Sequence, residues 1–475
     1  MNILLIAPSS GKWRHVGRAR LFNGKIFRFS LLSLLSVAAE TPAGHGIRIV
    51  DEQFDSIPGD GPVDLAGITC MTALAPRAYE IADAFRARGV PVVLGGMHPT
   101  FCPEEALSHA DAVVAGEAEG IWPRVVEDAR NGRLHGIYRA EKPSELAGLR
   151  RPPAHLLKKG RYSTWAVQAT RGCPHQCAFC AVSAFHRHQH RRRPVDEVTR
   201  EAAAIPARFF IFVDDNLTAD RDYARALFSR LAPLNKRWIT QSSLEIADDE
   251  NFVQAAAEAG CVGVFVGLET FSEANLSGVQ KTCNRIPEYR DKIRMLHRHG
   301  IGVEAGVVFG FDQDDPSVFA RALGQLDELE IDMVQISIFT PLPGTRQYEI
   351  TRGRITDRDW AHYDFHHVVF EPLRMSAEAL QAGHDWVTRE FYRPWRIVRR
   401  LARIVQRPRG WSVLPYAAAI NLAYYGRIRR WGIQGWDPGR ETERTGEILP
   451  WNAGPLPGGK GCWSESGWSS WSRWT

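Results

Sequence analysis

The sequence predicts an α/β protein with a doubly wound N-terminal domain, a second domain of six strand–helix units, and a helical C-terminal region. Short, continuous apolar runs alternate with helical segments from residue 1 to about 370. This pattern is typical of parallel sheets that are covered by helices. At 475 residues the chain is long enough for two or three domains, each with its own core. After Met375 strand signals stop and helical spacing takes over.

In residues 1–144, five apolar runs predict the buried strands of a doubly wound, Rossmann-like sheet. They are Ile3–Ala7, Ile47–Val50, Leu65–Thr69, Val92–Leu94 and Ala112–Ala115. The ligand of such a sheet binds beyond the carboxyl ends of its strands. The residues at those ends are mostly small or polar and are candidate ligand contacts: Thr69, Met71, Thr72, Gly95, Gly96, His98, Gly116 and Glu117.

Residues 145–163, rich in Pro, Arg and Leu, predict a linker that packs across both domains. Residues 164–370 predict six βα units that form a partial TIM-like barrel, open on one side. The expected strands are Thr164–Thr170, Phe209–Val213, Trp238–Gln241, Gly263–Val266, Val303–Val308 and Asp332–Phe339. In barrels of this kind the chemistry lies at the carboxyl ends of the strands.

A cysteine array, QATRGCPHQCAFCA, follows the first barrel strand. It places Cys173, Cys177 and Cys180 in a C-x3-C-x2-C spacing, and three thiolates so close in sequence can converge on one soft metal site. A [4Fe-4S] cluster normally takes four cysteines, so three would leave one iron open to another ligand. One alternative is a structural zinc site whose fourth ligand is a nearby histidine. The candidates for that ligand are His175, His186, His188 and His190. Another alternative is a disulfide that leaves the third cysteine unpaired.

The array closely resembles the cluster motif of the radical SAM enzymes. The resemblance implies that the open iron binds the amino and carboxylate groups of S-adenosylmethionine (SAM). An electron from the cluster would then cleave SAM to a 5′-deoxyadenosyl radical. Phe179, just before the last cysteine, matches the family position that packs against the adenine. The family match before and after the array favours the cluster over zinc.

Later strand ends also match the family, in the family's order. The VDDN segment matches the position that receives the methionine ammonium, and two further strand ends match positions that hold the ribose and carboxylate. GVVFGFDQDD resembles the glycine motif that lets backbone reach the adenine, and TPLPGT closes the sixth strand as in the cobalamin-linked branch. Taken singly, acidic residues at strand ends are often helix caps. The implied SAM contacts are Asp214, Asp215, Asn216, Gln241, Ser243, Glu269, Gly306 and Gly310.

The N-terminal domain carries a second resemblance. LGGMHPT followed by DAVVAGEAE resembles the cobalamin-binding domain that precedes many radical SAM domains. This implies that the strand-end residues named above contact cobalamin. The D-x-H-x-x-G motif that supplies a histidine to cobalt is absent, so no protein histidine is expected on the metal. The alternative is a vestigial domain that has lost its ligand.

Together the two resemblances imply cobalamin-dependent C-methylation of an unactivated carbon in a small-molecule or lipid-like metabolite. The family alternative is a radical cyclase or oxidase. A non-catalytic Fe–S or cobalamin sensor is disfavoured, because a sensor needs no adenosyl pocket. Methylthio transfer to tRNA is disfavoured because the N-terminal domain holds two cysteines, Cys70 and Cys102, and no second trio. An electron donor such as flavodoxin or ferredoxin is the expected partner.

Composition narrows the remaining possibilities. Hydrophobic residues make up 44% and charged residues 24%, as in ordinary globular proteins. The net charge of +5 is too small for this length to indicate a nucleic-acid partner. No signal peptide or membrane-length apolar run is recognised, so we expect a cytoplasmic enzyme. The basic run His186–Arg193 is expected to form a solvated face, with a path for an anionic substrate as the alternative.

Residues 371–436 are expected to be helical, with a break near Pro394, and residues 437–475 to form a disordered tail. One helix carries an apolar stripe of Ile397, Leu401, Ile404 and Val405 beside several arginines. A membrane surface would suit such a stripe, but packing against the open side of the barrel is favoured.

Overall fold

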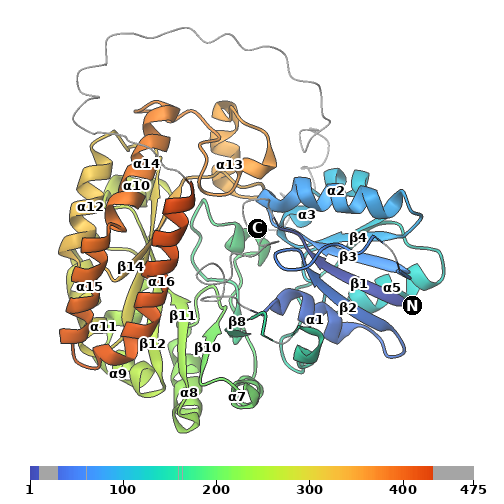
Figure 1. Cartoon of the computed structure of the whole chain (residues 1–475), viewed down its shortest axis with the longest axis horizontal. Helices are drawn as coiled ribbons and strands as arrows, with labels where there is room; N and C mark the ends of the chain where they lie inside the picture. Colours follow the sequence, from blue (N-terminus) through green and yellow to red (C-terminus); the bar gives the residue numbers. More distant parts are fainter. Residues whose placement is uncertain (10–29, 60, 159, 163, 432–475) are drawn as a thin grey trace.

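The computed structural model describes residues 1–9, 30–59, 61–158, 160–162 and 164–431. The fold contains two six-stranded parallel sheets, one in the N-terminal domain and one in the barrel domain, which lie beside each other (Figure 1). The α/β architecture predicted from the sequence is therefore confirmed. The expected tail, residues 437–475, lies outside the described residues.

The N-terminal sheet has the strand order β2-β1-β3-β4-β5-β6 and is parallel throughout. The strands are β1 Asn2–Ala7, β2 Gly46–Asp51, β3 Leu65–Thr69, β4 Val92–Gly95, β5 Ala112–Ala115 and β6 Gly136–Arg139. The helices are α1 Leu32–Glu40, α2 Ala75–Arg86, α3 Met97–Phe101, α4 Pro103–His109 and α5 Trp122–Arg130. Apolar residues of α1 and α5 pack on one face of the sheet, and those of α2 and α4 pack on the other. The sheet is doubly wound as expected, with β6 as an additional strand.

The barrel sheet has the order β14-β13-β12-β11-β10-β7, so β7 and β14 are its two edges among the described residues. Its strands are β7 Trp165–Val167, β10 Phe209–Phe212, β11 Arg237–Ser242, β12 Cys261–Glu269, β13 Gly302–Phe309 and β14 Met333–Ile338. The helices before the C-terminal region are α6 Ala181–Phe185, α7 Val195–Ala204, α8 Arg221–Leu231, α9 Glu250–Glu258, α10 Glu273–Gly278, α11 Tyr289–Arg298, α12 Val318–Glu328 and α13 Arg346–Thr351. Alternate strand residues such as Val264, Val303 and Ala305 form the core beneath the outer helices.

The C-terminal region contains α14 Ala377–Phe391, α15 Pro394–Gln406 and α16 Gly410–Trp431. Pro394 begins α15, so the expected break in the helix is present. Ile397 and Ile404 of the apolar stripe are buried, and Ile404 packs with α16 and the barrel sheet. The stripe is therefore packed inside the fold, as the favoured alternative expected. No helix in the described part of the chain has the length and apolar character needed to cross a bilayer.

The two domains are joined by specific contacts. Gly344, in the segment after β14, adopts φ +79°, and a Cβ there would lie 2.0 Å from the ring of Phe101 in the N-terminal domain. Trp360, in a short 3-10 turn, donates its indole N–H to Glu105 at 2.9 Å. The Ala166 amide of β7 donates to the Ser30 hydroxyl at 2.9 Å. These contacts fix the carboxyl edge of the N-terminal sheet against the barrel.

Candidate functional site

The cysteine array lies in a loop whose ends are joined by a short antiparallel ladder. β8 (Thr170–Arg171) pairs with β9 (Arg191–Arg192), so the intervening chain leaves and returns at one place. Gly172 begins the loop at φ +82°, and a Cβ there would lie 2.0 Å from a backbone carbonyl oxygen across the loop. Only glycine fits this close approach. The β8–β9 ladder and the Gly172 turn therefore close the loop at the end of the first barrel strand.

The three sulfur atoms of the array are too far apart to share a single ion. Within the described residues, none of the three cysteines joins a trio of candidate ligand atoms that all lie within 4.8 Å of one another. Three sulfurs on one zinc would lie about 3.8 Å apart, given Zn–S bonds of about 2.3 Å. Burial raises the pKa of the Cys177 thiol to about 12, so its thiolate needs positive charge from a metal. The donor set fits an iron–sulfur cluster held by Cys173, Cys177 and Cys180.

Asp214 supports the base of this loop. Its fully buried carboxylate accepts hydrogen bonds from the Ala169 amide at 3.1 Å, from the Thr170 hydroxyl at 2.7 Å and from the Thr170 amide. Burial raises the pKa of Asp214 to about 7, although these hydrogen bonds oppose the rise. The Asp214 carboxylate is thus hydrogen-bonded to the backbone beneath the loop, whereas the resemblance assigns it to the SAM ammonium.

The next polar residues lie closer to the cysteines. Asp215 accepts from the Gly172 amide at 2.8 Å, and burial raises its pKa. The Asn216 side-chain nitrogen lies 3.7 Å from the Cys173 sulfur and donates to the Ser243 hydroxyl at 3.3 Å. Asp215, Asn216 and Ser243 therefore lie near the start of the cysteine loop, and they would offer polar groups to a cofactor bound there.

Glu269 ends β12 in a strained conformation. Its φ of +63° is uncommon for a residue with a side chain, and such strain concentrates at functional positions. The carboxylate pairs with the Lys281 ammonium at 3.0 Å. Burial would lower the pKa of Lys281, but the charge of Glu269 keeps it above its ordinary value. The Lys281 charge in turn lowers the pKa of the Cys177 thiol, so this ion pair belongs to the surroundings of the cysteine loop.

Two further candidate SAM contacts lie at the barrel interior. Gln241 is exposed on the inner face of β11. Phe179 is half-buried, and its ring centroid lies 6.2 Å from that of Phe311. Both side chains are available to a ligand at the carboxyl edge of the sheet.

Side-chain packing also requires glycine at the two candidate SAM contacts Gly306 and Gly310. A Cβ on Gly306 would lie 2.9 Å from the Phe265 ring. Gly310 adopts φ +101°, and a Cβ there would lie 2.8 Å from the Leu380 side chain. Close packing alone therefore requires glycine here, in addition to any approach of backbone to adenine.

A cavity of about 340 Å³ lies between the N-terminal sheet and the cysteine loop. Five candidate cobalamin contacts line it: Thr69, Gly95, Gly96, Gly116 and Glu117. Its deeper walls are apolar and include Leu5, Leu34, Val93, Val114 and Trp122. The barrel contributes Gln168, Arg171, Phe185, His186 and Val213. The largely apolar lining would hold part of a cobalamin, and the five strand-end residues would contact it.

The other three candidate cobalamin contacts do not line this cavity. Met71 is 56% exposed, and Thr72 is buried at the start of a short turn. His98 is fully buried, and its Nε2 lies 3.3 Å from Glu105, which also accepts from Trp360. His98 therefore belongs to the contact between the domains.

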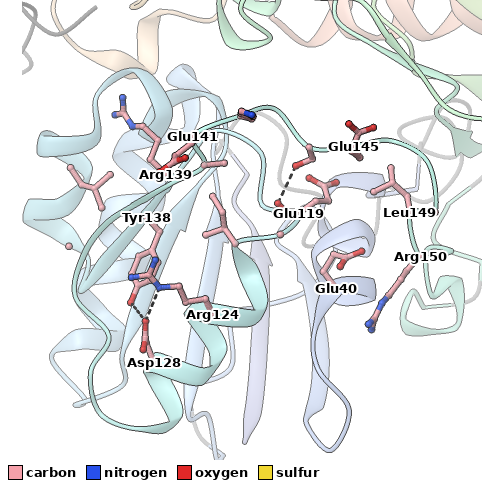
Figure 2. A pocket seen from close by; sticks show the side chains of 18 of the residues that line it. Glu40, Glu119, Arg124, Asp128, Tyr138, Arg139, Glu141, Glu145, Leu149 and Arg150 are labelled. Atoms are coloured by element: carbon pink, nitrogen blue, oxygen red, sulfur yellow. Dashed lines mark hydrogen bonds and ion pairs between the residues drawn. The ribbon is translucent and has the colours of Figure 1, made fainter.

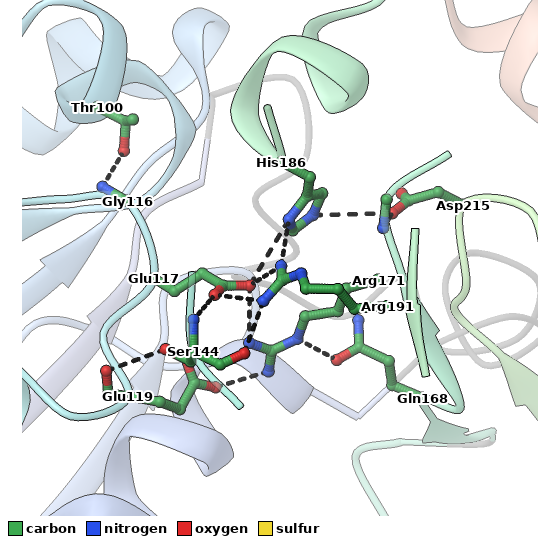
Figure 3. Close-up of polar contacts among 11 residues, drawn as sticks. Thr100, Gly116, Glu117, Glu119, Ser144, Gln168, Arg171, His186, Arg191 and Asp215 are labelled. Atoms are coloured by element: carbon green, nitrogen blue, oxygen red, sulfur yellow. Dashed lines mark hydrogen bonds and ion pairs between the residues drawn. The ribbon is translucent and has the colours of Figure 1, made fainter. Parts of the chain in front are cut away.

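Glu117 joins the cavity to the cysteine loop through a buried ionic network (Figure 3). Its carboxylate accepts from Arg191 at 2.6 and 2.9 Å, from Arg171 at 3.1 Å, and from the Ser144 amide at 2.8 Å. Arg171 also donates to Glu119 at 2.6 Å. Burial would raise the pKa of Glu117, but the hydrogen bond from Arg191 and both guanidinium charges lower it to about 2. The carboxylate is saturated by protein donors, so Glu117 acts here as a bridge between domains.

His186 lies at the edge of the same network (Figure 3). Its Nδ1 is 3.6 Å from the Glu117 carboxylate and its Nε2 is 3.8 Å from Asp215. Burial lowers the pKa of His186 to about 4, so the ring is neutral near pH 7.

Sequence reasoning missed the arginines of this network. Arg171 lies in the cysteine stretch but received no role, and Arg191 belongs to the run expected to be solvated. That expectation is wrong for Arg191 and Arg193: Arg193 is buried and donates to the Gln168 carbonyl at 2.7 Å. Strand-like alternation over residues 191–193 is a local signal that could have indicated inward-facing arginines.

A larger, open hollow of about 1280 Å³ runs along β6, α5 and the following segment (Figure 2). Charged side chains of both signs line it, and Tyr138 and Arg124 both contact Asp128. None of the predicted site residues lines this hollow, although Glu119 lines both the hollow and the cavity beside the cysteine loop.

Comparisons with known proteins agree with the two-domain organisation. The model described as "Radical SAM superfamily" matches residues 167–323, and the model "B12 binding domain" matches residues 42–126. The chain is 30% identical to bacteriochlorophyllide d C-12(1)-methyltransferase of Chlorobaculum tepidum, over 78% of this chain and 84% of the relative. It is 31% identical to bacteriochlorophyllide d C-8(2)-methyltransferase of the same organism, over 80% and 91%.

More distant matches include one further sequence relative and a solved structure. The anaerobic magnesium-protoporphyrin IX monomethyl ester cyclase of Rubrivivax gelatinosus is 25% identical, over 66% of this chain and 62% of the relative. The radical SAM methyltransferase TsrM of Kitasatospora setae, solved with cobalamin and a [4Fe-4S] cluster, superposes with a TM-score of 0.62 at 17% identity. That superposition covers 82% of this chain and 85% of TsrM, which shows a shared fold. The chain belongs to the cobalamin-dependent radical SAM enzymes, and its cofactors are a [4Fe-4S] cluster, SAM and cobalamin.

Proposed function

We propose that this protein is a cobalamin-dependent radical SAM methyltransferase that methylates a carbon of a large, mostly apolar ring compound such as a tetrapyrrole. The observation that carries the proposal is the cavity between the domains. It combines strand-end residues of the N-terminal sheet with Arg171 and His186 from the base of the cysteine loop. Identity of 30–31% to two bacteriochlorophyllide methyltransferases supports the substrate class.

When bound, the cluster with SAM supplies the radical that removes a substrate hydrogen atom, and cobalamin supplies the methyl group. The protein's own residues hold and orient these cofactors. Cys173, Cys177 and Cys180 hold the cluster, and Asp215, Asn216, Ser243 and Glu269 offer the polar groups that a zwitterionic cofactor requires. The apolar cavity walls exclude water from the junction. A flavodoxin or ferredoxin is the proposed electron donor.

Anaerobic turnover with SAM labelled in its methyl group and bacteriochlorophyllide d as substrate tests the proposal. The labelled methyl group is expected in the tetrapyrrole product, with both 5′-deoxyadenosine and S-adenosylhomocysteine formed. A product with a new ring or oxygen function and no added methyl group would favour the cyclase alternative, which the cyclase relative supports.

Replacement of Gly95 by leucine is expected to eject cobalamin while the fold persists. A Cβ at Gly95 meets nothing closer than 3.7 Å, so the protein accommodates it, but the longer side chain enters the cavity that Gly95 lines. Bound cobalamin is measured by absorbance after anaerobic reconstitution. Unchanged cobalamin content in Gly95→Leu would contradict this location of the ligand.

The neighbouring glycine is a matched comparison. Gly96 adopts φ +104°, and a Cβ there would lie 2.8 Å from the Cys70 carbonyl oxygen. Gly96→Leu is therefore expected to destabilise the fold, by about 1–3 kcal/mol from the backbone conformation alone. Thermal unfolding separates the two variants: Gly95→Leu should remain near the wild type, and Gly96→Leu should not.

A further inference from the structure

The inner face of the barrel sheet carries a polar and aromatic row. The strand register places Gln241, Phe265 and Glu304 side by side on β11 to β13, and the next residue in the row, Met333 of β14, is buried under α15 and α16. Their sequence neighbours, such as Val264 and Val303, belong to the core beneath the outer helices. Because side chains alternate along a strand, the row itself faces the barrel interior. Gln241 is exposed, and Phe265 and Glu304 are half-buried, so the middle of the inner face is accessible.

Helix α16 covers the part of the inner face next to this row, and it runs along the barrel sheet in Figure 1. A Cβ on Gly263 would lie 2.6 Å from the Tyr416 ring, and a Cβ on Gly302 would lie 2.6 Å from Val413. The two glycines let the helix lie directly on the strands. The Tyr416 hydroxyl then reaches the next row and donates to Glu304 at 3.1 Å. Glu304 and Tyr416 thus stand where the covered part of the inner face ends.

Glu304 has no charged partner among the described residues. Its carboxylate accepts a hydrogen bond from Tyr416, and burial raises its pKa to about 7, with that hydrogen bond opposing the rise. Two other phenols, Tyr392 and Tyr424, lie close enough for its charge to raise their pKa values. A carboxyl group with a pKa of about 7 is about half protonated at pH 7, and its protonated form can donate a hydrogen bond.

An aromatic surface adjoins the carboxyl group. The Phe265 ring lies over Gly306, because a Cβ on that glycine would be 2.9 Å from the ring. Gln335 pairs with Gly306 in register and is exposed on the same face. The inner face therefore offers a flat apolar contact next to a small number of hydrogen-bonding groups, as sites for mostly apolar ligands do.

We propose that Glu304 and Tyr416 bind an oxygen atom of the substrate, a carbonyl or hydroxyl group on a mostly apolar ring compound, while Phe265 packs against its ring surface. This inference rests on the proposed function and specifies its substrate site. The contact fixes the substrate's orientation and so determines which carbon faces the cofactors. Sites built around a buried hydrogen-bonding group discriminate strongly against ligands that leave the group unpaired.

Fluorescence titration with bacteriochlorophyllide d, without turnover, tests the site in the fully reconstituted protein. Glu304→Leu is expected to weaken binding by about 10- to 100-fold, because it removes the hydrogen bond and leaves the substrate oxygen unpaired. Glu304→Gln keeps a donor of the same shape and is expected to restore most of the affinity. Glu258→Leu, an exposed glutamate on the outer helix α9, is the matched control and should bind as the wild type does.

Tyr416→Phe keeps the ring on Gly263 and removes the hydroxyl, so it tests the site even if Glu304→Leu fails to fold. It should weaken binding in the same direction. Equal affinity of the wild type, Glu304→Leu and Tyr416→Phe would overturn the site, as would a wild type that does not bind the tetrapyrrole. Binding that depends on Glu304 without a methylated product would instead overturn the proposed function and retain the site.

Discussion

Cys177→Ala is expected to lose the cluster and with it all reductive cleavage of SAM. The three cysteines are the donor set that the loop offers, and Cys177 is its buried member, at 7% exposed. Removal of one thiolate leaves two, which cannot hold a cluster that needs three or four protein ligands. Anaerobic reconstitution followed by iron and sulfide analysis should give about four of each in the wild type and background amounts in the variant. Formation of 5′-deoxyadenosine should fall to background in parallel.

Cys283→Ala is the matched control for this prediction. Cys283 is buried near the loop, and its charge raises the pKa of the Cys177 thiol, so it is the cysteine best placed to act as a fourth ligand. If three cysteines hold the cluster and one iron stays open for SAM, Cys283→Ala keeps both iron and SAM cleavage. Loss of the cluster in this variant would indicate four protein ligands, and stoichiometric zinc in the wild type would contradict the cluster itself.

The fold was predictable where a strand has a strong local signal. Apolar runs such as Ile3–Ala7 and Leu65–Thr69 mark buried parallel strands, and both are present as β1 and β3. β6 was not predicted because its four residues, GIYR, contain one buried side chain, that of Tyr138. β12 extends from Cys261 to Glu269, beyond the predicted Gly263–Val266, because tertiary pairing carries it past Gly267.

The candidate site likewise contains residues that local sequence predicts and residues that it does not. The cysteine array could be predicted as a cluster site because its cysteines are closely spaced within a single loop. The role of Asp214 could not, because an acidic residue after a strand gives no sign that the β8 backbone will surround it. Lys281 and Glu304 belong to no motif, and their partners lie 12 and 112 residues away in sequence. Long-range packing, which the sequence pattern does not encode locally, gives these residues their surroundings.

Glu117→Gln is expected to weaken the connection between the cobalamin cavity and the cysteine loop. In the wild type, the Glu117 carboxylate bridges Arg191 and Arg171, and each of the three side chains is at most 17% exposed. The neutral amide cannot balance two buried guanidinium groups, and breaking such a buried pair costs about 3–5 kcal/mol. A lower midpoint of thermal or denaturant unfolding measures this loss.

The pKa of Glu117 gives an independent check on that magnitude and its sign. The pKa falls from an ordinary 4.5 to about 2, which corresponds to about 3 kcal/mol of stabilisation by the ionised carboxylate. Because the folded-state pKa is the lower one, this contribution is present above pH 4.5 and declines as the pH falls toward 2. The stability difference between the wild type and Glu117→Gln should therefore shrink by about 1 kcal/mol between pH 7 and pH 4.

Loss of Glu117 is also expected to change how the cobalamin cavity is positioned against the cysteine loop. A double variant separates this effect from the loss of stability. Glu117→Gln with Arg191→Met removes both members of the closest pair. Stability should partly recover, because the buried guanidinium still facing the amide, that of Arg171, keeps the Glu119 carboxylate as its partner. The bridge from the cavity to the loop is still missing, and a displacement of about 1 Å at a reacting centre can lower a rate by about 100-fold. In both variants, methylated product is thus expected to fall more than 5′-deoxyadenosine does, so that the ratio of deoxyadenosine to product rises by about tenfold or more. If the double variant regains stability and the wild-type ratio together, Glu117 stabilises the fold without positioning the two cofactor sites.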